Sequence, residues 1–319
     1  MKQSSVTVLL TVRNNASTIR KCVESLLNQN YNNYKIYITE AYSTDKTYQI
    51  LDSLRKKYSK KIVLERIHGN MSVAYNHMLK KVNTDFVAFT DGDAVCDKNW
   101  LKELMSGFKP VVVAVGGMIR NPKTENKLQM LIGRELEYRF SNLPNNVSRL
   151  PTMNLCVRTK AAKAEKFDEK LRVAQETEWG YRLNKYGRTK FNKKAIVWHY
   201  HRATWKAYIK QQYLYAQNMP RVYLSKKHGT KISGDEISNP WSAILLGSVG
   251  LFLLLSIFYI PYIYLFYISF VVTLISYIAR SFMIVNNIID VIYLSFIFFI
   301  REFVWIFGVL SGLSKVFKK

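Results

Sequence analysis

The strongest constraint on the fold is the alternation of short apolar runs with amphipathic segments in the first hundred residues. Residues 6–12 form a continuous β-branched and leucine run, and residues 19–27 then carry apolar side chains at helical spacing. Further apolar runs at 34–39, 61–67 and 86–89 are each separated by a helical segment. Strands that alternate with helices through short connections predict an α/β fold with a doubly wound, mostly parallel sheet.

Polar residues gather where these expected strands end. They occupy positions 11–14, 40–45, 68–72 and 91–93. Ligands of such sheets bind outside the carboxyl ends of the strands, so we expect one site there. Asp91-Gly92-Asp93 places two carboxylates one residue apart, and hard divalent cations such as Mg²⁺ or Mn²⁺ favour oxygen ligands of this kind. Because Asp-Gly-Asp also makes an ordinary surface turn, the motif alone leaves both interpretations open.

The middle of the chain is less regular. Its composition predicts strands near 111–117, 150–157 and 188–198, and helices near 127–140 and 176–186. The last of these strands runs into His199-Tyr200-His201.

The composition changes sharply at Trp241, after which the chain is almost continuously apolar. Segments 241–260 and 261–279 are each long enough to cross a hydrocarbon core of about 30 Å. A third segment, 284–313, is interrupted by charged residues, and it is compatible with spanning, re-entering or lying in the interface. We expect a two-span hairpin and an interfacial third helix, with the terminal lysines favouring a cytosolic C-terminus.

The net charge is +25, of which +22 lies in the first 240 residues because only five cations and two acids follow. Such a domain attracts polyanions, which include nucleic acid, anionic lipid headgroups and phosphorylated substrates. Beside an apolar tail the membrane is the favoured partner, and nucleic acid is not expected. The helix expected at 204–227 mixes aromatic residues with lysines, so it is either solvated or lies on the bilayer.

Cysteine usage and the N-terminus indicate the compartment. The three cysteines show no CxxC spacing, which favours a reducing environment. The apolar run at the N-terminus is too short for a signal peptide. We therefore expect a multi-pass membrane protein whose first domain lies on the cytoplasmic face.

Four segments together carry a resemblance to a known family. They are VTVLLTVRNNASTIRKCVESLLNQNY, YKIYITEAYSTDKTYQIL, FVAFTDGD and FDEKLRVAQETEWGYRLNKYG. In this order the chain resembles family 2 glycosyltransferases of the GT-A fold, in particular the membrane-anchored kind, over roughly residues 6–218. The resemblance implies a GT-A-like domain at 1–230, with a donor half at 1–120 and an acceptor half at 121–230. The C-terminal membrane region would then occupy residues 231–319.

The resemblance implies a nucleotide site made of residues at the strand ends. These are Thr11, Arg13, Asn14, Glu40, Asn70 and Asp91. Glu40 stands where the family usually has aspartate and would accept an N–H of the base, although a loop-capping acid is the alternative. Ser43 and Asp45 could cap the following helix or contact ligand. Tyr75 departs from the basic residue often found near that position.

The resemblance also implies a bound Mn²⁺ or Mg²⁺, which would neutralise the charge of a departing nucleoside diphosphate. Asp93 is the expected direct ligand, and Asp91 would be shared between the metal and the ribose. His199 corresponds to a late metal-binding histidine of the family, since a neutral imidazole can join carboxylates on such an ion. A hydrogen-bonded core role for His199, or metal binding by His201, remains open.

An acceptor hydroxyl needs a base as it attacks the sugar. By resemblance Glu176 is that base, although Gln175 replaces the first acid of the family's usual pair. Glu178 is the alternative on the acceptor side, where Asn154 is also expected to line the cleft. Both acids could instead be residues that the helix dipole favours at a helix start. One base opposite a leaving phosphate implies inversion at the sugar carbon.

We therefore expect transfer of a single sugar from a nucleotide-diphospho-sugar to a lipid-phosphate or lipid-linked glycan acceptor at the membrane. The glutamine-arginine-tryptophan signature of processive synthases is absent around Gln211–Tyr215, and two or three spans enclose little. A processive polysaccharide synthase is the nearest alternative. A basic, membrane-tethered binding or scaffold protein without catalysis is the alternative from another class.

Overall fold

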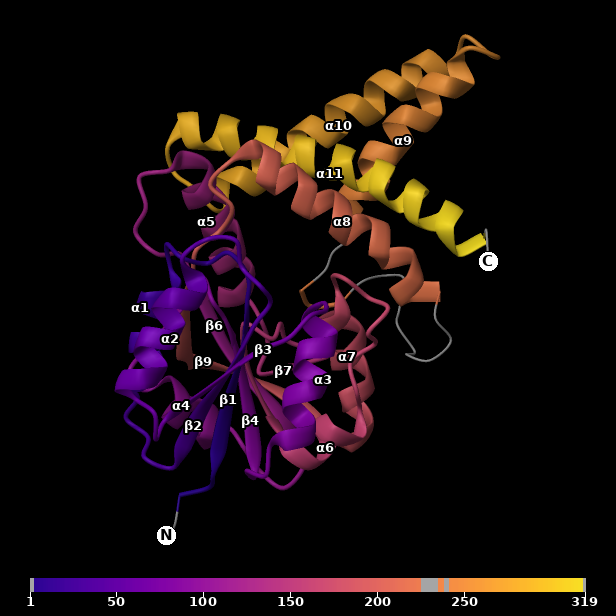
Figure 1. Cartoon of the computed structure of the whole chain (residues 1–319). Helices are drawn as coiled ribbons and strands as arrows, with labels where there is room; N and C mark the ends of the chain where they lie inside the picture. Colours follow the sequence, from indigo (N-terminus) through magenta and orange to yellow (C-terminus); the bar gives the residue numbers. More distant parts are fainter. Residues whose placement is uncertain (1–2, 225–234, 238–240, 318–319) are drawn as a thin grey trace. The chain divides into compact units, whose positions relative to one another are not determined.

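The computed structural model describes residues 3–224, 235–237 and 241–317 (Figure 1). Contacts between Cα atoms divide the chain into two compact units. The first comprises Met1–Pro122 and Arg139–His201, and the second comprises Lys123–Tyr138 and Arg202–Lys319. The domain boundary expected at residue 230 lies outside the described residues.

The first part of unit 1 is the parallel sheet that the sequence predicts. Its strands are β1 (Val6–Val12), β2 (Tyr34–Glu40), β3 (Ile62–Arg66) and β4 (Phe86–Asp91), paired in parallel in the order β3-β2-β1-β4. The helices between them are α1 (Ile19–Leu27), α2 (Thr47–Lys57) and α3 (Met71–Lys81). All four strands therefore end at one edge of the sheet, as expected for this fold class.

The second part of unit 1 turns the sheet into a mixed one. Strand β8 (Asn154–Arg158) lies antiparallel between β4 and β6 (Val112–Arg120), and β9 (Arg188–His199) lies parallel to β6. Two short strands, β5 (Ala94–Cys96) and β7 (Asn146–Val147), pair antiparallel with β9. The helices here are α4 (Trp100–Ser106), α6 (Thr159–Ala164), α7 (Gln175–Leu183) and a 3-10 turn at Asn184–Tyr186. The expected α/β class is confirmed, whereas β5, β7, α4 and α6 were too short for the sequence pattern to reveal.

Helices cover both faces of this sheet. Figure 1 shows α1 and α2 on one side, and α3, α6 and α7 on the other. Ile19, Leu51 and Trp100 are among the buried residues that pack on the strands on the first side. On the other side Phe167 stacks on Trp179 with ring centroids 4.2 Å apart. Burial on two faces explains why the strands read as continuous apolar runs.

Unit 2 is helical in the part of the chain that the structure describes. It contains the start of α5 (Lys127–Ser141), with α8 (Trp205–Leu224), α9 (Trp241–Ser256), α10 (Tyr262–Phe282) and α11 (Ile288–Phe317). Helices α10 and α11 are long and apolar enough to cross a membrane, while α9 is shorter than the expected span 241–260. Helices α8 and α11 pack very closely, since a Cβ on Gly308 would lie 2.5 Å from the Cβ of Ala216. Small residues allow this approach of two helix backbones.

The charges that interrupt the last apolar segment have partners within unit 2. Asp290 pairs with Lys127 of α5. Arg301 lies 3.4 Å from Glu135 Oε1, which also accepts a 2.6 Å hydrogen bond from Arg280 at the end of α10. Ionised groups are buried at acceptable cost only when they are paired in this way. The start of α5 is thus bound to the apolar helices by charge as well as by apolar packing.

Candidate active site

The Asp91-Gly92-Asp93 turn is held through its backbone by helix α1. The Thr18 hydroxyl donates a 2.8 Å hydrogen bond to the carbonyl oxygen of Gly92, and the Cys22 thiol lies 3.3 Å from that of Asp91. Both acidic side chains are left partly exposed at the end of β4. Since α1 begins directly after the loop that follows β1, the first strand–helix unit positions the acidic turn.

Gly92 is required for space rather than for an unusual backbone angle. In the described residues, positive φ among glycines occurs at Gly69 and Gly187 but not at Gly92. A Cβ at Gly92 would lie 2.8 Å from Cγ1 of Val12 and 3.1 Å from Cγ of Asn15. The loop after β1 therefore packs directly against the acidic turn, which an ordinary solvent-exposed surface turn would not require.

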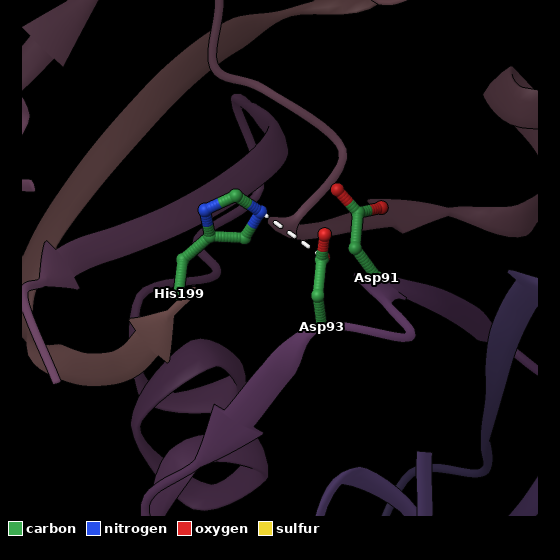
Figure 2. A group of neighbouring side chains, drawn as sticks. All are labelled: Asp91, Asp93 and His199. Carbon is green, nitrogen blue, oxygen red and sulfur yellow. Dashed lines mark ion pairs between the residues drawn. The ribbon is translucent and has the colours of Figure 1, made fainter. Parts of the chain in front are cut away.

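Strand pairing brings His199 to this turn. Strand β5 pairs with the end of β9 so that Ala94 lies opposite His199, and the Tyr200 N–H donates to the Asp93 carbonyl oxygen at 2.9 Å. The His199 Nε2 atom lies 3.1 Å from Asp93 Oδ1 (Figure 2). One ligand atom from each of Asp91, Asp93 and His199 fits within 4.8 Å of the other two.

This donor set fits a divalent cation. Two carboxylates and one imidazole, without a thiolate, suit Mn²⁺ or Mg²⁺ better than a soft metal. Within the described residues, the candidate metal group takes His199 and not His201. The centroids of the two imidazole rings are 4.8 Å apart and their planes are inclined at 67°, so His201 flanks the group. His199 is thus the better placed of the two histidines that the sequence left open.

The residues expected to bind nucleotide lie at the same edge. Thr11 is opposite Asp91 in the β1–β4 register, and Glu40 is opposite Val12 in the β1–β2 register. Arg13 is exposed in the loop after β1. Asn14 has a φ of 55°, and its N–H donates to Ser43 Oγ at 2.9 Å. Asparagine tolerates this left-handed conformation, and here it joins the loops after β1 and β2.

Glu40 does not face a ligand. Its side chain is fully buried, Oε1 accepts a hydrogen bond from the Ser43 N–H, and Oε2 accepts one from Arg66 Nε at 2.8 Å. Burial raises the pKa of Glu40, but the hydrogen bonds from Ser43 and Arg66 outweigh burial and hold this pKa below its ordinary value. The carboxylate is therefore ionised, and it binds Ser43 and Arg66 of the protein itself. These contacts match the loop-capping alternative rather than a contact with the base.

Two other polar residues of the expected site also organise loops. Asn70 caps α3 by accepting from the Val73 N–H at 3.1 Å, and its Nδ2 donates to the Glu169 carbonyl oxygen at 2.7 Å. Asp45 accepts from the Ala16 N–H at 3.0 Å. Neither contact excludes a ligand, but each gives the residue a structural role of its own.

The expected base, Glu176, lies in the first turn of α7 and is half-buried. Ala174, which precedes the helix, has a φ of 62°. A non-glycine residue in this region is strained, and such strain concentrates at functional sites. Burial raises the pKa of Tyr75, and the nearby carboxylates of Asp91 and, more weakly, Glu176 raise it further. The acidic turn and Glu176 therefore both act electrostatically on the same buried phenol.

Glu178, the alternative to Glu176, is held by an arginine. Arg182 donates from Nε to one carboxylate oxygen of Glu178 at 2.7 Å and from Nη2 to the other at 2.8 Å. Arg182 also pairs with Glu165. This bidentate contact fixes Glu178 in a buried ion-pair network, which favours Glu176 as the base.

The structure does not place Asn154 on a cleft. Its side chain is 1% exposed, and its Oδ1 accepts from Trp100 Nε1 at 2.8 Å. Its Nδ2 donates at 2.9 Å to the carbonyl oxygens of both Met118 and Ala195. Asn154 therefore links β8 to β6 and β9 inside the sheet. The acceptor-side role expected from the resemblance needs correction, because that resemblance could not show which partners would use up the amide.

Sequence reasoning also missed two residues that shape the site. Thr18 holds the acidic turn, and Arg66 pairs with Glu40. Both lie far along the chain from the residues they contact, and nothing in the sequence pairs either of them with its partner. The only available signal was that Arg66 ends a strand whose carboxyl end faces the same edge.

Comparison with known proteins identifies the family. The family model described as Glycosyl transferase family 2 matches residues 7–171, just over half of the chain, and the chain therefore belongs to this family. The resemblance and the GT-A fold class drawn from the sequence are confirmed.

Individual relatives are similar either over less than half of this chain or over most of it at an identity below 25%. One relative, from Methanococcus voltae, is 29% identical over 133 residues, which are 38% of this chain and 40% of that protein. It is described as dolichyl N-acetyl-alpha-D-glucosaminyl phosphate 3-beta-D-2,3-diacetamido-2,3-dideoxy-beta-D-glucuronosyltransferase. The poly-beta-1,6-N-acetyl-D-glucosamine synthase of Staphylococcus epidermidis is 24% identical over 95% of this chain and 71% of that protein. Mannosyltransferase PcManGT from Pyrobaculum calidifontis, solved in complex with GDP-Man and Mn²⁺, aligns over 98% of this chain and 88% of that chain. Its TM-score is 0.61 at 14% identity, which shows a shared fold.

Proposed function

We propose that this chain is a metal-dependent glycosyltransferase that moves one sugar from a nucleotide-diphospho-sugar to an acceptor hydroxyl or phosphate. The observation that carries the proposal is the group formed by Asp91, Asp93 and His199 at the carboxyl edge of the parallel strands. Membership of family 2 and the fold shared with a mannosyltransferase solved in complex with GDP-Man and Mn²⁺ support it.

The residues of the site have separable tasks. Asp91, Asp93 and His199 would hold Mn²⁺ or Mg²⁺, and the ion when bound would neutralise charge on the departing nucleoside diphosphate. Thr11, Arg13 and Asn14 form the adjoining edge on which the nucleotide would lie.

Glu176 would take the proton from the acceptor as its oxygen attacks the anomeric carbon. The bond to the diphosphate breaks as the new bond forms on the opposite face, so the configuration inverts. The strained backbone at Ala174 fixes the helix start that carries Glu176. It acts on the position of the carboxylate rather than on the proton itself.

The acceptor is proposed to be a lipid phosphate or a lipid-linked glycan at the membrane. Helices α10 and α11 are apolar and long enough to enter a bilayer, and the name of the Methanococcus relative includes a dolichyl phosphate sugar. Unit 2 would be the membrane region, crossing more than once. Unit 1, rich in cations, would lie at the cytoplasmic face among anionic headgroups.

A processive polysaccharide synthase is the second candidate function. It is favoured by the Staphylococcus epidermidis relative, whose match extends over 95% of this chain. The two functions differ in product, because a single-sugar transferase releases acceptors that are one residue longer. Mass spectrometry of the lipid fraction after reaction separates a single mass step from a ladder.

The main test is nucleotide-sugar turnover by the detergent-solubilised chain with Mn²⁺. Asp93→Asn should abolish release of nucleoside diphosphate, and chelation of the metal should do the same to the wild type. Glu176→Gln should lower transfer by about 10²–10⁴-fold while donor binding is kept. Glu178→Gln is the matched control, which should lower thermal stability but retain turnover. Full activity of Asp93→Asn, or loss of turnover only in Glu178→Gln, would contradict the assignment.

A further inference from the structure

Four planar side chains form a stack at the carboxyl ends of β2 and β3. The Arg66 guanidinium carbon lies 4.2 Å from the ring centroid of Tyr42 and 4.4 Å from that of Tyr48. The other partner of Tyr42 is His68, whose ring is parallel within 6° at a centroid distance of 3.7 Å. Tyr42 has a φ of 50° and is 39% exposed. The chain thus accepts backbone strain to place an aromatic ring at the solvent edge of the expected nucleotide site.

The buried carboxylate of Glu40 orients Arg66. Arg66 Nε donates to Glu40 Oε2 at 2.8 Å, and the arginine itself is exposed. Throughout the described residues, Nε makes the only hydrogen bond of the Arg66 side chain, so both terminal amino groups keep their N–H donors. The ion pair with Glu40 and the contacts with the rings of Tyr42 and Tyr48 fix the orientation of the planar Arg66 guanidinium.

This arrangement changes what the site can recognise. Glu40 offers a base no exposed acceptor, because its side chain is fully buried and its two oxygens already accept hydrogen bonds from Ser43 and Arg66. The groups beside Glu40 that can bind a ligand are the terminal N–H donors of Arg66. Uracil presents a donor between two acceptors, so an arginine fork alone satisfies it poorly. Guanine presents O6 and N7 side by side, the pair of acceptors that arginine most often reads.

The position agrees with a nucleotide that extends to the acidic turn. Arg66 ends β3, and Asp91 ends β4, in the strand order β3-β2-β1-β4. Three strand spacings separate them, about 14 Å. This leaves room for a ribose and two phosphates between a base at Arg66 and a metal at Asp91.

We propose that Arg66 determines base specificity and selects a guanine nucleotide, with Glu40 as its positioning residue. This inference rests on the proposed nucleotide-sugar function. It replaces the direct contact between Glu40 and the base that the sequence suggested. Tyr42 and Tyr48 then act by holding the plane of the guanidinium rather than by contacting the phosphates.

The test is calorimetric titration of the full detergent-solubilised chain with GDP, UDP, CDP and ADP in the presence of Mn²⁺. The wild type should bind GDP most tightly. Arg66→Gln should weaken GDP binding about tenfold or more, with a much smaller effect on UDP, so that the GDP/UDP ratio collapses. Arg66→Lys should also lose the preference for GDP over UDP, because lysine keeps the positive charge but lacks the planar guanidinium with its paired N–H donors. Because the GDP and UDP affinities are measured on the same sample, their ratio does not depend on the fraction of the protein that is folded.

Two further variants sharpen the result. Arg55→Gln is the matched control, since Arg55 lies on α2, pairs with Asp52 and carries the same charge, and it should leave the ratio unchanged. Glu40→Gln should lower the ratio, and the double variant should be no worse than Arg66→Gln alone, because Glu40 acts through Arg66.

The outcomes distinguish a failure of the proposed function from a failure of the role of Arg66. If no nucleoside diphosphate binds the wild type, the proposed function fails. If nucleotides bind but UDP, CDP or ADP is preferred, or Arg66→Gln weakens all four equally, the proposed function survives and the role of Arg66 is overturned. A further loss of the ratio in the double variant beyond Arg66→Gln would overturn the positioning role of Glu40.

Discussion

Substitution of Gly92 by alanine tests whether the acidic turn is a built site. The new Cβ would lie 2.8 Å from Cγ1 of Val12, which is 3% exposed and belongs to the core of unit 1. It would also lie 3.1 Å from Cγ of Asn15. Since Val12 cannot move outwards, the turn that carries Asp91 and Asp93 must shift instead.

The size of the effect follows from overpacking. An added methyl group in a tightly packed site costs about 1–3 kcal/mol of unfolding free energy. For a unit of this size each kcal/mol lowers the Tm by roughly 2–4 °C, so a fall of about 2–12 °C is expected. A displaced ligand pair should weaken Mn²⁺ binding by about 10–100-fold, the range found when contacts that orient metal ligands are lost.

The assay is a Mn²⁺ titration followed by electron paramagnetic resonance, combined with thermal unfolding of the same sample. Gly250→Ala is the control, because a Cβ at that position would have no heavy atom within 4 Å apart from its chain neighbours and the backbone of its own helix. It should leave Mn²⁺ binding unchanged and should not lower the Tm, since alanine favours a helix interior over glycine. Wild-type Mn²⁺ affinity and Tm in Gly92→Ala would contradict the tight packing of the acidic turn and would mean that Asp91-Gly92-Asp93 is an ordinary turn.

Two other substitutions follow from the structure. Ala174→Gly should raise the unfolding free energy by about 1 kcal/mol or less, because relief of about 1–2 kcal/mol of strain is offset by the larger freedom of unfolded glycine. Turnover should fall as Glu176 loses its fixed position; equal turnover with higher stability would contradict that role. Burial raises the pKa of Glu65, but Lys81, His77 and a tyrosine outweigh it and lower this pKa from 4.5 to about 2. The stability that Glu65 contributes is therefore complete above pH 4.5 and lost as the pH falls towards 2. Urea unfolding across this range should show a smaller loss in Glu65→Gln, and identical pH profiles would contradict the pKa assignment.

The local pattern of the sequence determined the strand–helix framework. Continuous apolar runs and helical spacing follow from burial on two faces of a sheet and on one face of a helix. They were sufficient to predict β1 to β4, the helices between them and the edge at which they end. The Asp91-Gly92-Asp93 motif could be placed at that edge for the same reason, since it directly follows an apolar run.

The tertiary structure alone decided which side chains meet. His199 reaches Asp93 because the three-residue strand β5 pairs with β9, and a strand so short leaves no pattern in the sequence. Glu40 became a buried partner of Arg66, and Asn154 became a link within the sheet, because contacts distant along the chain used their polar atoms. Residue type fixes what a side chain can bind, but only its folded surroundings determine whether its hydrogen-bonding atoms are still free to do so.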